Sequence, residues 1–87
     1  MEFNFDPQKS RSNKLKHGID FTEAQELWTD PGIIEIPARS IDESRFLVVG
    51  KLRERYWSAV ITYRAEVVRI ISVRRSRKED VELYEQC

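Results

Sequence analysis

Positive charge is concentrated in the last third of the chain, where the stretch VRIISVRRSRKED holds four arginines and one lysine. Residues 51–78 contain nine basic and two acidic residues, a net charge of +7 within a chain whose formal net charge is zero. Arginine is always protonated, and its planar fork of donors matches the oxygens of a phosphate. The segment therefore indicates a binding site for an anion, and arginines held on strands suit single-stranded RNA.

Two plainer interpretations of this charge remain open. Charge runs are commonly solvated strand faces, and nearby carboxylates could pair with the arginines, namely Glu79, Asp80, Glu82 and Glu85. A binding module without catalytic activity would also carry this pattern if its basic sheet face docked an acidic peptide or a nucleic acid. Such an interface would be sensitive to salt.

His17 is the only histidine and Cys87 the only cysteine, so one chain cannot complete a four-ligand zinc site. The sequence also lacks a glycine-rich phosphate loop, and we expect neither a metal nor a cofactor. His17 stands just before Gly18, where a cation interacts favourably with the carboxyl end of a helix. That placement accounts for the histidine without catalysis, although histidine is a residue type that commonly transfers protons.

The length of 87 residues predicts a single domain over residues 1–87. A hydrophobic fraction of 40% and a charged fraction of 34% are typical of a globular protein with a highly charged surface. A single cysteine fits a reducing compartment. No apolar run approaches the ~20 residues that a membrane-spanning helix needs. We therefore expect a cytoplasmic protein with no membrane partner.

The first part of the chain predicts a short strand and two helices. EFNF alternates weakly, as a strand would, and Asp6 with Pro7 then supplies a helix cap and a first helical residue. Gly18 ends this helix. Asp20 and Glu23 have the spacing of a capping box that starts the second helix. The second helix carries one apolar stripe, formed by Phe21, Ala24, Leu27 and Trp28.

The remainder predicts four strands and a final helix. IIEIPA, RFLVVGKL, RYWSAVITYR and VVRIISVR are rich in β-branched and aromatic residues, and the short joints after the second and third favour antiparallel hairpins. RKEDVELYEQ is typical of a helix that turns Val81 and Tyr84 inward. The helices have too little apolar surface to pack on one another, so we expect them to pack on the sheet. The predicted fold is α+β, an antiparallel sheet with two N-terminal helices and a C-terminal helix, in the order β-α-α-β-β-β-β-α.

A hairpin turn at residues 65–66 would set Arg64 opposite Val67. Thr62 would then oppose Arg69, and because side chains alternate across a strand, this register distributes both strands over two faces. The half-polar face would hold Tyr56, Ser58, Val60, Thr62, Arg64, Arg69, Ile71, Val73 and Arg75. The face expected to pack on the core would hold Trp57, Ala59, Ile61, Tyr63, Val68, Ile70, Ser72 and Arg74.

Three ordered blocks of the chain resemble a known family. FDPQKSRSNKLKHGIDFTEAQELWTDP is similar to the N-terminal block of BrnT-type toxins, ESRFLVVG to their second block, and TYRAEVVRIISVRRSRKEDVELYE to their third. The resemblance covers nearly the whole chain. Two departures concern packing and a loop: Val73 stands where the family more often has alanine, and the turn after Arg64 lacks the usual glycine.

The resemblance implies a toxin of a bacterial type II toxin–antitoxin pair with a fold similar to that of RelE-type ribonucleases. It implies metal-independent cleavage of RNA that blocks translation. It also implies a cognate antitoxin that neutralises the toxin and forms an oligomeric complex with it. Promoter DNA would be reached only through the antitoxin.

Cleavage of this kind depends on stabilising negative charge. The ribose 2′-hydroxyl attacks the adjacent phosphate, and preorganised arginines stabilise the charge that develops on the phosphate oxygens. The predicted catalytic residues are Arg64, Arg74, Arg75, Tyr84 and His17, and the predicted RNA-binding residues are Arg69, Arg77 and Lys78. Tyr84 would equally suit base stacking or simple packing of the last helix, so the general acid and base stay open.

Overall fold

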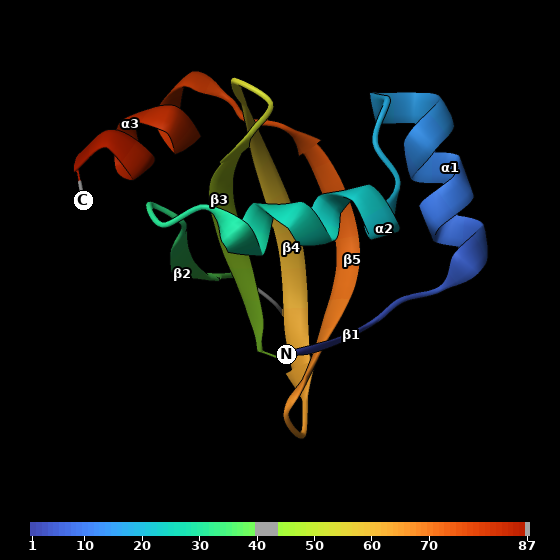
Figure 1. Ribbon diagram of the computed structural model, residues 1–87. Coiled ribbons are helices and arrows are strands. Elements are labelled where there is room, and N and C mark those ends of the chain that lie inside the picture. Colours follow the sequence, from blue (N-terminus) through green and yellow to red (C-terminus); the bar gives the residue numbers. More distant parts are fainter. Residues whose placement is uncertain (40–43, 87) are drawn as a thin grey trace.

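The computed structural model describes residues 1–39 and 44–86. Along the chain run β1 (Glu2–Asn4), α1 (Pro7–His17), α2 (Phe21–Ala24), the 3-10 helix η1 (Gln25–Thr29), β2 (Ile34–Ala38), β3 (Arg45–Leu52), β4 (Arg55–Arg64), β5 (Val67–Arg75) and α3 (Lys78–Gln86) (Figure 1). The predicted α+β class and element order are confirmed. The second predicted helix tightens into the 3-10 form after its first turn.

The strands form one sheet in the order β1-β5-β4-β3-β2. β2 to β5 pair as antiparallel neighbours, which confirms the predicted meander. β1 is the exception, because it pairs parallel to β5 and places Glu2 beside Val67. β1 also sets Phe3 edge-on to Trp28, with ring centroids 5.0 Å apart. The first strand thus ties η1 to the margin of the sheet.

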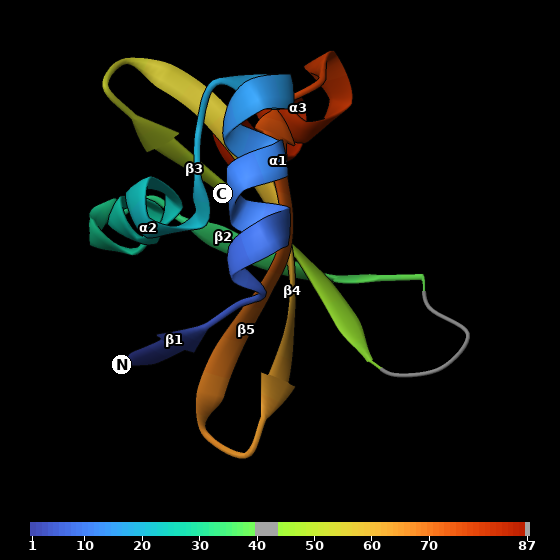
Figure 2. The ribbon, with the colours of Figure 1, turned by 90° about the vertical axis from the view of Figure 1, so that its right-hand side faces the viewer.

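The helices cover the two faces of the sheet unequally. α2 and η1 cross one face, α1 lies beside β5, and α3 lies on the other side near one end (Figures 1 and 2). The main core lies under α2 and η1 and consists of Ile19, Phe21, Ala24, Leu27, Val48, Trp57, Ala59, Ile61, Val68, Ile70 and Val73. Burial of these apolar side chains is the chief stabilising contribution.

Hydrogen bonds, rather than apolar packing, hold α1 in place, since its only buried residues are Ser10 and Asn13. Asn13 Nδ2 donates to the carbonyls of Ile19 at 2.8 Å and Val73 at 2.9 Å, and Asn13 Oδ1 accepts from Val73 N at 3.2 Å. Ser10 Oγ accepts from the backbone N–H of Phe21 at 2.9 Å. Buried polar groups need such partners, so α1 is fixed against β5 in one position.

The predicted helix ends are confirmed. Asp6 accepts from Gln8 N, and Gly18 closes α1 with a φ of 82°, a conformation that glycine adopts without steric cost. Asp20 and Glu23 form the capping box that starts α2. Together these signals fix the tight turn between α1 and α2.

The β4–β5 register begins as predicted, with Arg64 opposite Val67 and Thr62 opposite Arg69. It then shifts between Val60 and Ile61, because Ile61 pairs with Ile70 whereas Val60 pairs with Ser72. Ile71 is therefore an extra residue in β5, a β-bulge. An extra residue reverses which face each later side chain occupies.

The bulge makes the predicted faces wrong beyond Ile71. Val73, expected on the half-polar face, is fully buried in the core. Arg75 pairs with Trp57 and so lies on the helix-covered face, whereas Arg74 pairs with Ser58 on the opposite face. Ser72, expected to face the core, is exposed. The cause is one inserted residue, which strict alternation does not anticipate.

Candidate nucleic-acid interface

The β3–β4 hairpin and the connection from β5 to α3 lie at the same end of the sheet (Figure 1). Basic residues are concentrated in these two segments. We call this region the basic end and define it by Lys51, Arg53, Arg55, Arg74, Arg75, Arg77 and Lys78. All but the half-buried Arg74 are exposed. The basic end therefore presents exposed positive charge that would attract an anionic polymer.

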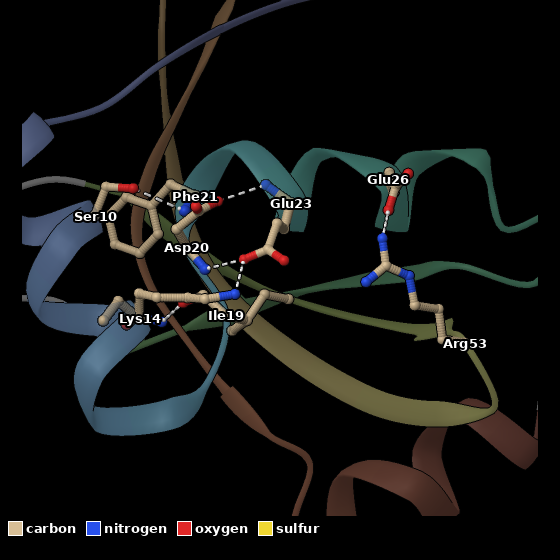
Figure 3. A network of polar contacts seen from close by, with 9 residues as sticks. Ser10, Lys14, Ile19, Asp20, Phe21, Glu23, Glu26 and Arg53 are labelled. Atoms are coloured by element: carbon tan, nitrogen blue, oxygen red, sulfur yellow. Dashed lines mark hydrogen bonds and ion pairs between the residues drawn. The ribbon is translucent and has the colours of Figure 1, made fainter.

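A tight hairpin turn presents two of these arginines. Arg53 and Glu54 both adopt positive φ, 52° and 66°, although neither is a glycine. A left-handed conformation costs about 1–2 kcal/mol per such residue. Arg53 also pairs with Glu26 of η1 across 3.3 Å (Figure 3). This turn holds Arg55 at the first position of β4, directly opposite Leu52.

A pocket of about 200 Å³ opens beside this turn. The α1–α2 connection forms one wall and the β3–β4 hairpin the other. Its lining residues are Gly18, Ile19, Glu23, Leu52, Arg53, Arg55 and Trp57. Sequence reasoning counted the arginines at 53 and 55 among the basic residues but assigned them no role. It also read Trp57 only as core.

Arg75 lies over the indole of Trp57, with its guanidinium carbon 5.6 Å from the ring centroid. Trp57 is only 8% exposed, so the arginine covers the ring. A stacked guanidinium keeps its edge N–H groups available as donors. Among the described residues no carboxylate pairs with Arg75, and its charge stays available to an anion.

Arg74 has a different environment on the opposite face. Its Nη1 lies 2.6 Å from Oδ2 of Asp80, a carboxylate that is only 4% exposed. The same oxygen accepts from Ser58 Oγ at 3.0 Å and from Arg77 N at 2.9 Å. Burial alone would raise the pKa of Asp80, but hydrogen bonds from Arg74, Arg77 and Ser58 outweigh it and lower that pKa. The structure thus shows that Arg74 pairs with Asp80, a carboxylate of the last helix.

Arg64 and Arg69 lie toward the opposite end of the sheet. Arg64 closes β4, six positions beyond Ser58, which corresponds to about 20 Å along a strand. Arg69 donates to the side chain of Asn4 on β1. The expectation that Arg64, Arg74 and Arg75 surround one phosphate is therefore wrong in its geometry, because they occupy two ends and two faces.

The two predicted proton-transfer residues are also separated. His17 is the last residue of α1, next to the pocket residue Gly18, and it is half-buried. Tyr84 packs edge-on against Tyr56, whose side chain points to the face opposite Trp57, with centroids 5.2 Å apart. His17 thus adjoins the pocket, whereas Tyr84 does not.

The hydroxyl of Tyr84 donates to Oδ2 of Asp30 at 2.8 Å. This hydrogen bond, together with burial, raises the pKa of Tyr84 to about 12. Asp30 also accepts from the backbone N–H groups of Gly32 and Lys51. Tyr84 therefore links α3 to the turn before β2 and to the end of β3.

Glu23 is a pocket residue that sequence reasoning treated only as part of a helix cap. Its Oε1 accepts from Lys14 Nζ at 2.7 Å and from Asp20 N at 3.0 Å (Figure 3). The hydrogen bond from Lys14 and that from the Asp20 backbone lower the pKa of Glu23. The pocket therefore holds an ionised carboxylate beside Arg53 and Arg55.

Residues 1–39 and 44–86 contain neither a cluster of metal-ligating side chains nor a helix that could span a membrane. No group of three or more histidine, cysteine, aspartate or glutamate side chains is placed to hold a metal ion. None of the helices in these ranges is long and apolar enough to cross a membrane.

The fold and the basic end define a small α+β protein with a surface suited to polyanions. Residues 5–80 match the family described as "Ribonuclease toxin, BrnT, of type II toxin-antitoxin system". The match spans most of the chain, which therefore belongs to this family and confirms the resemblance found in the sequence. Membership of a type II system implies an antitoxin partner. No curated protein matches the chain.

Proposed function

We propose that the protein cleaves RNA at the basic end, in the pocket beside Trp57, and that it needs no metal. The observation that carries this proposal is that Arg55 lines an exposed pocket together with Trp57, the residue over whose ring Arg75 is stacked. By cleaving RNA in the cytoplasm the toxin would stop translation, and its antitoxin would neutralise it.

The proposed reaction is an internal displacement at phosphorus. The 2′-hydroxyl loses its proton and bonds to the adjacent phosphorus, while the bond to the 5′-oxygen breaks and that oxygen takes up a proton. The products are a 2′,3′-cyclic phosphate and a 5′-hydroxyl end. Arg75 and Arg55 stabilise the charge that builds up on the non-bridging oxygens.

The remaining basic residues are assigned by their environments. Arg77 and Lys78 are exposed at the start of α3 and bind phosphates that flank the cleaved bond. Arg74, already paired with Asp80, keeps the end of β5 in place and offers its remaining donors. Arg64 and Arg69 bind RNA away from the reaction, because the length of β4 separates them from the pocket.

We assign proton transfer to residues in or next to the pocket. Glu23 lines it and supplies the carboxylate for removal of the 2′-hydroxyl proton, although the hydrogen bonds that lower its pKa also make it a weaker base. His17 adjoins it through Gly18 and suits donation to the leaving 5′-oxygen. Tyr84, whose hydroxyl is bound to Asp30, is better suited to holding α3 than to the reaction.

The test of the reaction is cleavage of RNA by purified protein in the presence of EDTA. We expect products that end in a 2′,3′-cyclic phosphate, with Arg75→Ala and Arg55→Ala strongly impaired. Arg39→Ala, which removes an exposed charge outside the basic end, serves as the matched control. RNA left intact, or equal cleavage by all variants, would contradict the proposal.

The test of the physiological role is expression in a bacterial host with and without the cognate antitoxin. The toxin alone is expected to stop protein synthesis and growth, and the antitoxin to restore both. A non-catalytic binding module using the same basic face predicts complex formation without growth arrest. Growth arrest that persists in Arg75→Ala would show that toxicity does not arise from the proposed site.

A further inference from the structure

The sheet has a second apolar surface, on the face opposite α2 and η1. Leu47 pairs with Ile36 of β2 on one side and with Val60 of β4 on the other. Their neighbours along the strands, Val48 and Ala59, belong to the main core, so alternation turns the three aliphatic side chains to the opposite face. We call Ile36, Leu47 and Val60 the apolar row. All three are half-buried, and none belongs to the main core.

α3 lies on this side of the sheet but near one end (Figures 1 and 2). Its Asp80 accepts a hydrogen bond from Ser58, which is only 1% exposed, and its Tyr84 packs on Tyr56. Val60 is two positions beyond Ser58 along β4, about 7 Å further from the contact between the tyrosines. A solvated face of an antiparallel sheet normally carries polar side chains. Three adjacent aliphatic side chains are instead typical of a surface that another molecule covers.

The strands around the apolar row place basic and no acidic side chains on this face. Glu35 is the only acidic residue of β2 to β5, and it lies on the opposite face, where Tyr63 donates to it. Strand alternation and pairing turn five cations to the face of the apolar row, namely Arg45, Lys51, Arg64, Arg69 and Arg74. This face therefore suits a partner that is both apolar and acidic.

Arg45 is the cation next to the apolar row, two positions from Leu47 on β3. Within residues 1–39 and 44–86, its guanidinium forms no ion pair, and its Nε is buried without a hydrogen-bond partner. A buried donor left without a partner costs free energy. An unpaired guanidinium beside aliphatic side chains is suited to a carboxylate that another chain supplies.

We propose that the apolar row is the docking surface for the antitoxin, through a helix with aliphatic side chains on one side and acidic side chains at its edges. The inference rests on the proposed function for the existence of this partner. Aliphatic side chains offer RNA neither hydrogen bonds nor stacking, which favours a protein over a nucleic acid. A helix on this face would form a second layer on the sheet, as α2 and η1 do on the first. Its carboxylates would pair with Arg45.

The experiment measures the affinity of the purified cognate antitoxin for wild-type toxin and for Leu47→Glu by calorimetry. The variant places a carboxylate in the centre of the apolar row, where it opposes an apolar and acidic partner. We expect the affinity to fall about thirtyfold or more, the loss typical of a central interface residue. RNA cleavage should be retained but no longer inhibited by the antitoxin. Leu15→Glu, which places the same charge at a position of α1 that is 91% exposed, is the matched control and should bind like wild type.

Two further variants keep the test independent of folding defects. Leu47→Thr retains a residue suited to a strand, and it replaces Leu47→Glu if urea unfolding shows the latter to be unfolded. We expect it to lower the affinity about tenfold. Arg45→Gln removes the charge beside the apolar row and should reduce the dependence of antitoxin affinity on salt.

Each other outcome has a definite meaning. Unchanged affinity in the Leu47 variants, or an equal loss in Leu15→Glu, would overturn the inference. A wild-type toxin that dimerises alone, and that Leu47→Glu makes monomeric, would assign the apolar row to a second copy and also overturn it. Loss of RNA cleavage in a folded Leu47→Glu that still binds antitoxin would assign the surface to RNA, with the same consequence. If wild type binds antitoxin but cleaves no RNA, the proposed reaction fails, and the Leu47 variants still support or overturn the docking surface.

Discussion

Arg75 and Trp57 are direct partners across β4 and β5, with the guanidinium carbon 5.6 Å from the ring centroid. They share a face because Ile71 is an extra residue in β5. Without the bulge Arg75 would point to the other side of the sheet, away from the pocket. A local irregularity in one strand thus determines on which face of the sheet the exposed guanidinium of Arg75 lies.

Replacing Arg75 is expected to impair the reaction without unfolding the protein. Arg75→Ala should lower the single-turnover cleavage rate about 10²–10³-fold, the usual effect of removing one preorganised donor. Arg75→Lys keeps the charge but loses the fork and the stacking, so an intermediate rate is expected. Urea unfolding provides the control, and a large fall in stability would show that the arginine is mainly structural.

Replacing Asn13 is expected to destabilise the fold. Asn13→Ala leaves the backbone N–H and C=O of Val73 and the carbonyl of Ile19 without this partner in a buried region. We expect the free energy of unfolding to fall by about 2–4 kcal/mol. Ser12→Ala, at an exposed position of the same helix, should change it by less than about 0.5 kcal/mol. An Asn13→Ala variant as stable as wild type would show that α1 is held by other contacts.

Asp80 is expected to make stability depend on pH in the acid range. Its folded pKa lies below the ordinary value of 3.8, so its contribution is complete above that value and is lost as the pH falls through the folded pKa. Asp80→Asn should lower the free energy of unfolding by about 2 kcal/mol at pH 7, an estimate reduced because Arg74 is partly exposed. The difference from wild type, measured by urea unfolding, should shrink below about pH 4. A constant difference down to pH 2 would contradict this account.

Replacing Tyr84 distinguishes a structural role from a chemical one. Tyr84→Phe removes the hydrogen bond to Asp30 and should lower the free energy of unfolding by about 1–2 kcal/mol. Because the folded pKa of Tyr84 is about 12, above the ordinary value of 10, this contribution should persist up to about pH 10 and decline above it. Cleavage should change by no more than a few-fold. A hundredfold loss of cleavage at unchanged stability would instead show that Tyr84 takes part in the reaction.

The sequence predicts most of the fold where its signals are local. The helix signals act within one or two turns of the chain: Asp6 and Gly18 for α1, and the Asp20–Glu23 capping box for α2. The structure confirms each of them. The hairpin at residues 65–66 fixes the pairing of its neighbours in the same way. The parallel pairing of β1 was not predicted, since it joins distant segments and leaves no short-range pattern.

The candidate site depends on relationships that no local pattern reveals. The bulge at Ile71 has no glycine to mark it, so alternation misplaced the later residues of β5. Arg64 and Arg75 are near in sequence, but extended strands separate them because the chain reverses only at residues 65–66. Arg75 reaches Trp57 because β4 and β5 pair, and Arg55 lines the same pocket as Trp57 beside the α1–α2 connection.

The parallel pairing of β1 with β5 also bears on how the toxin is made. Asn4 and Arg69 are neighbours in space but 65 positions apart in the chain. While the protein is being synthesised, its first strand cannot pair until its last strand has been made, and contacts of such long range form slowly. The nascent chain thus has no finished sheet on which to present Arg75 until the polypeptide is almost complete.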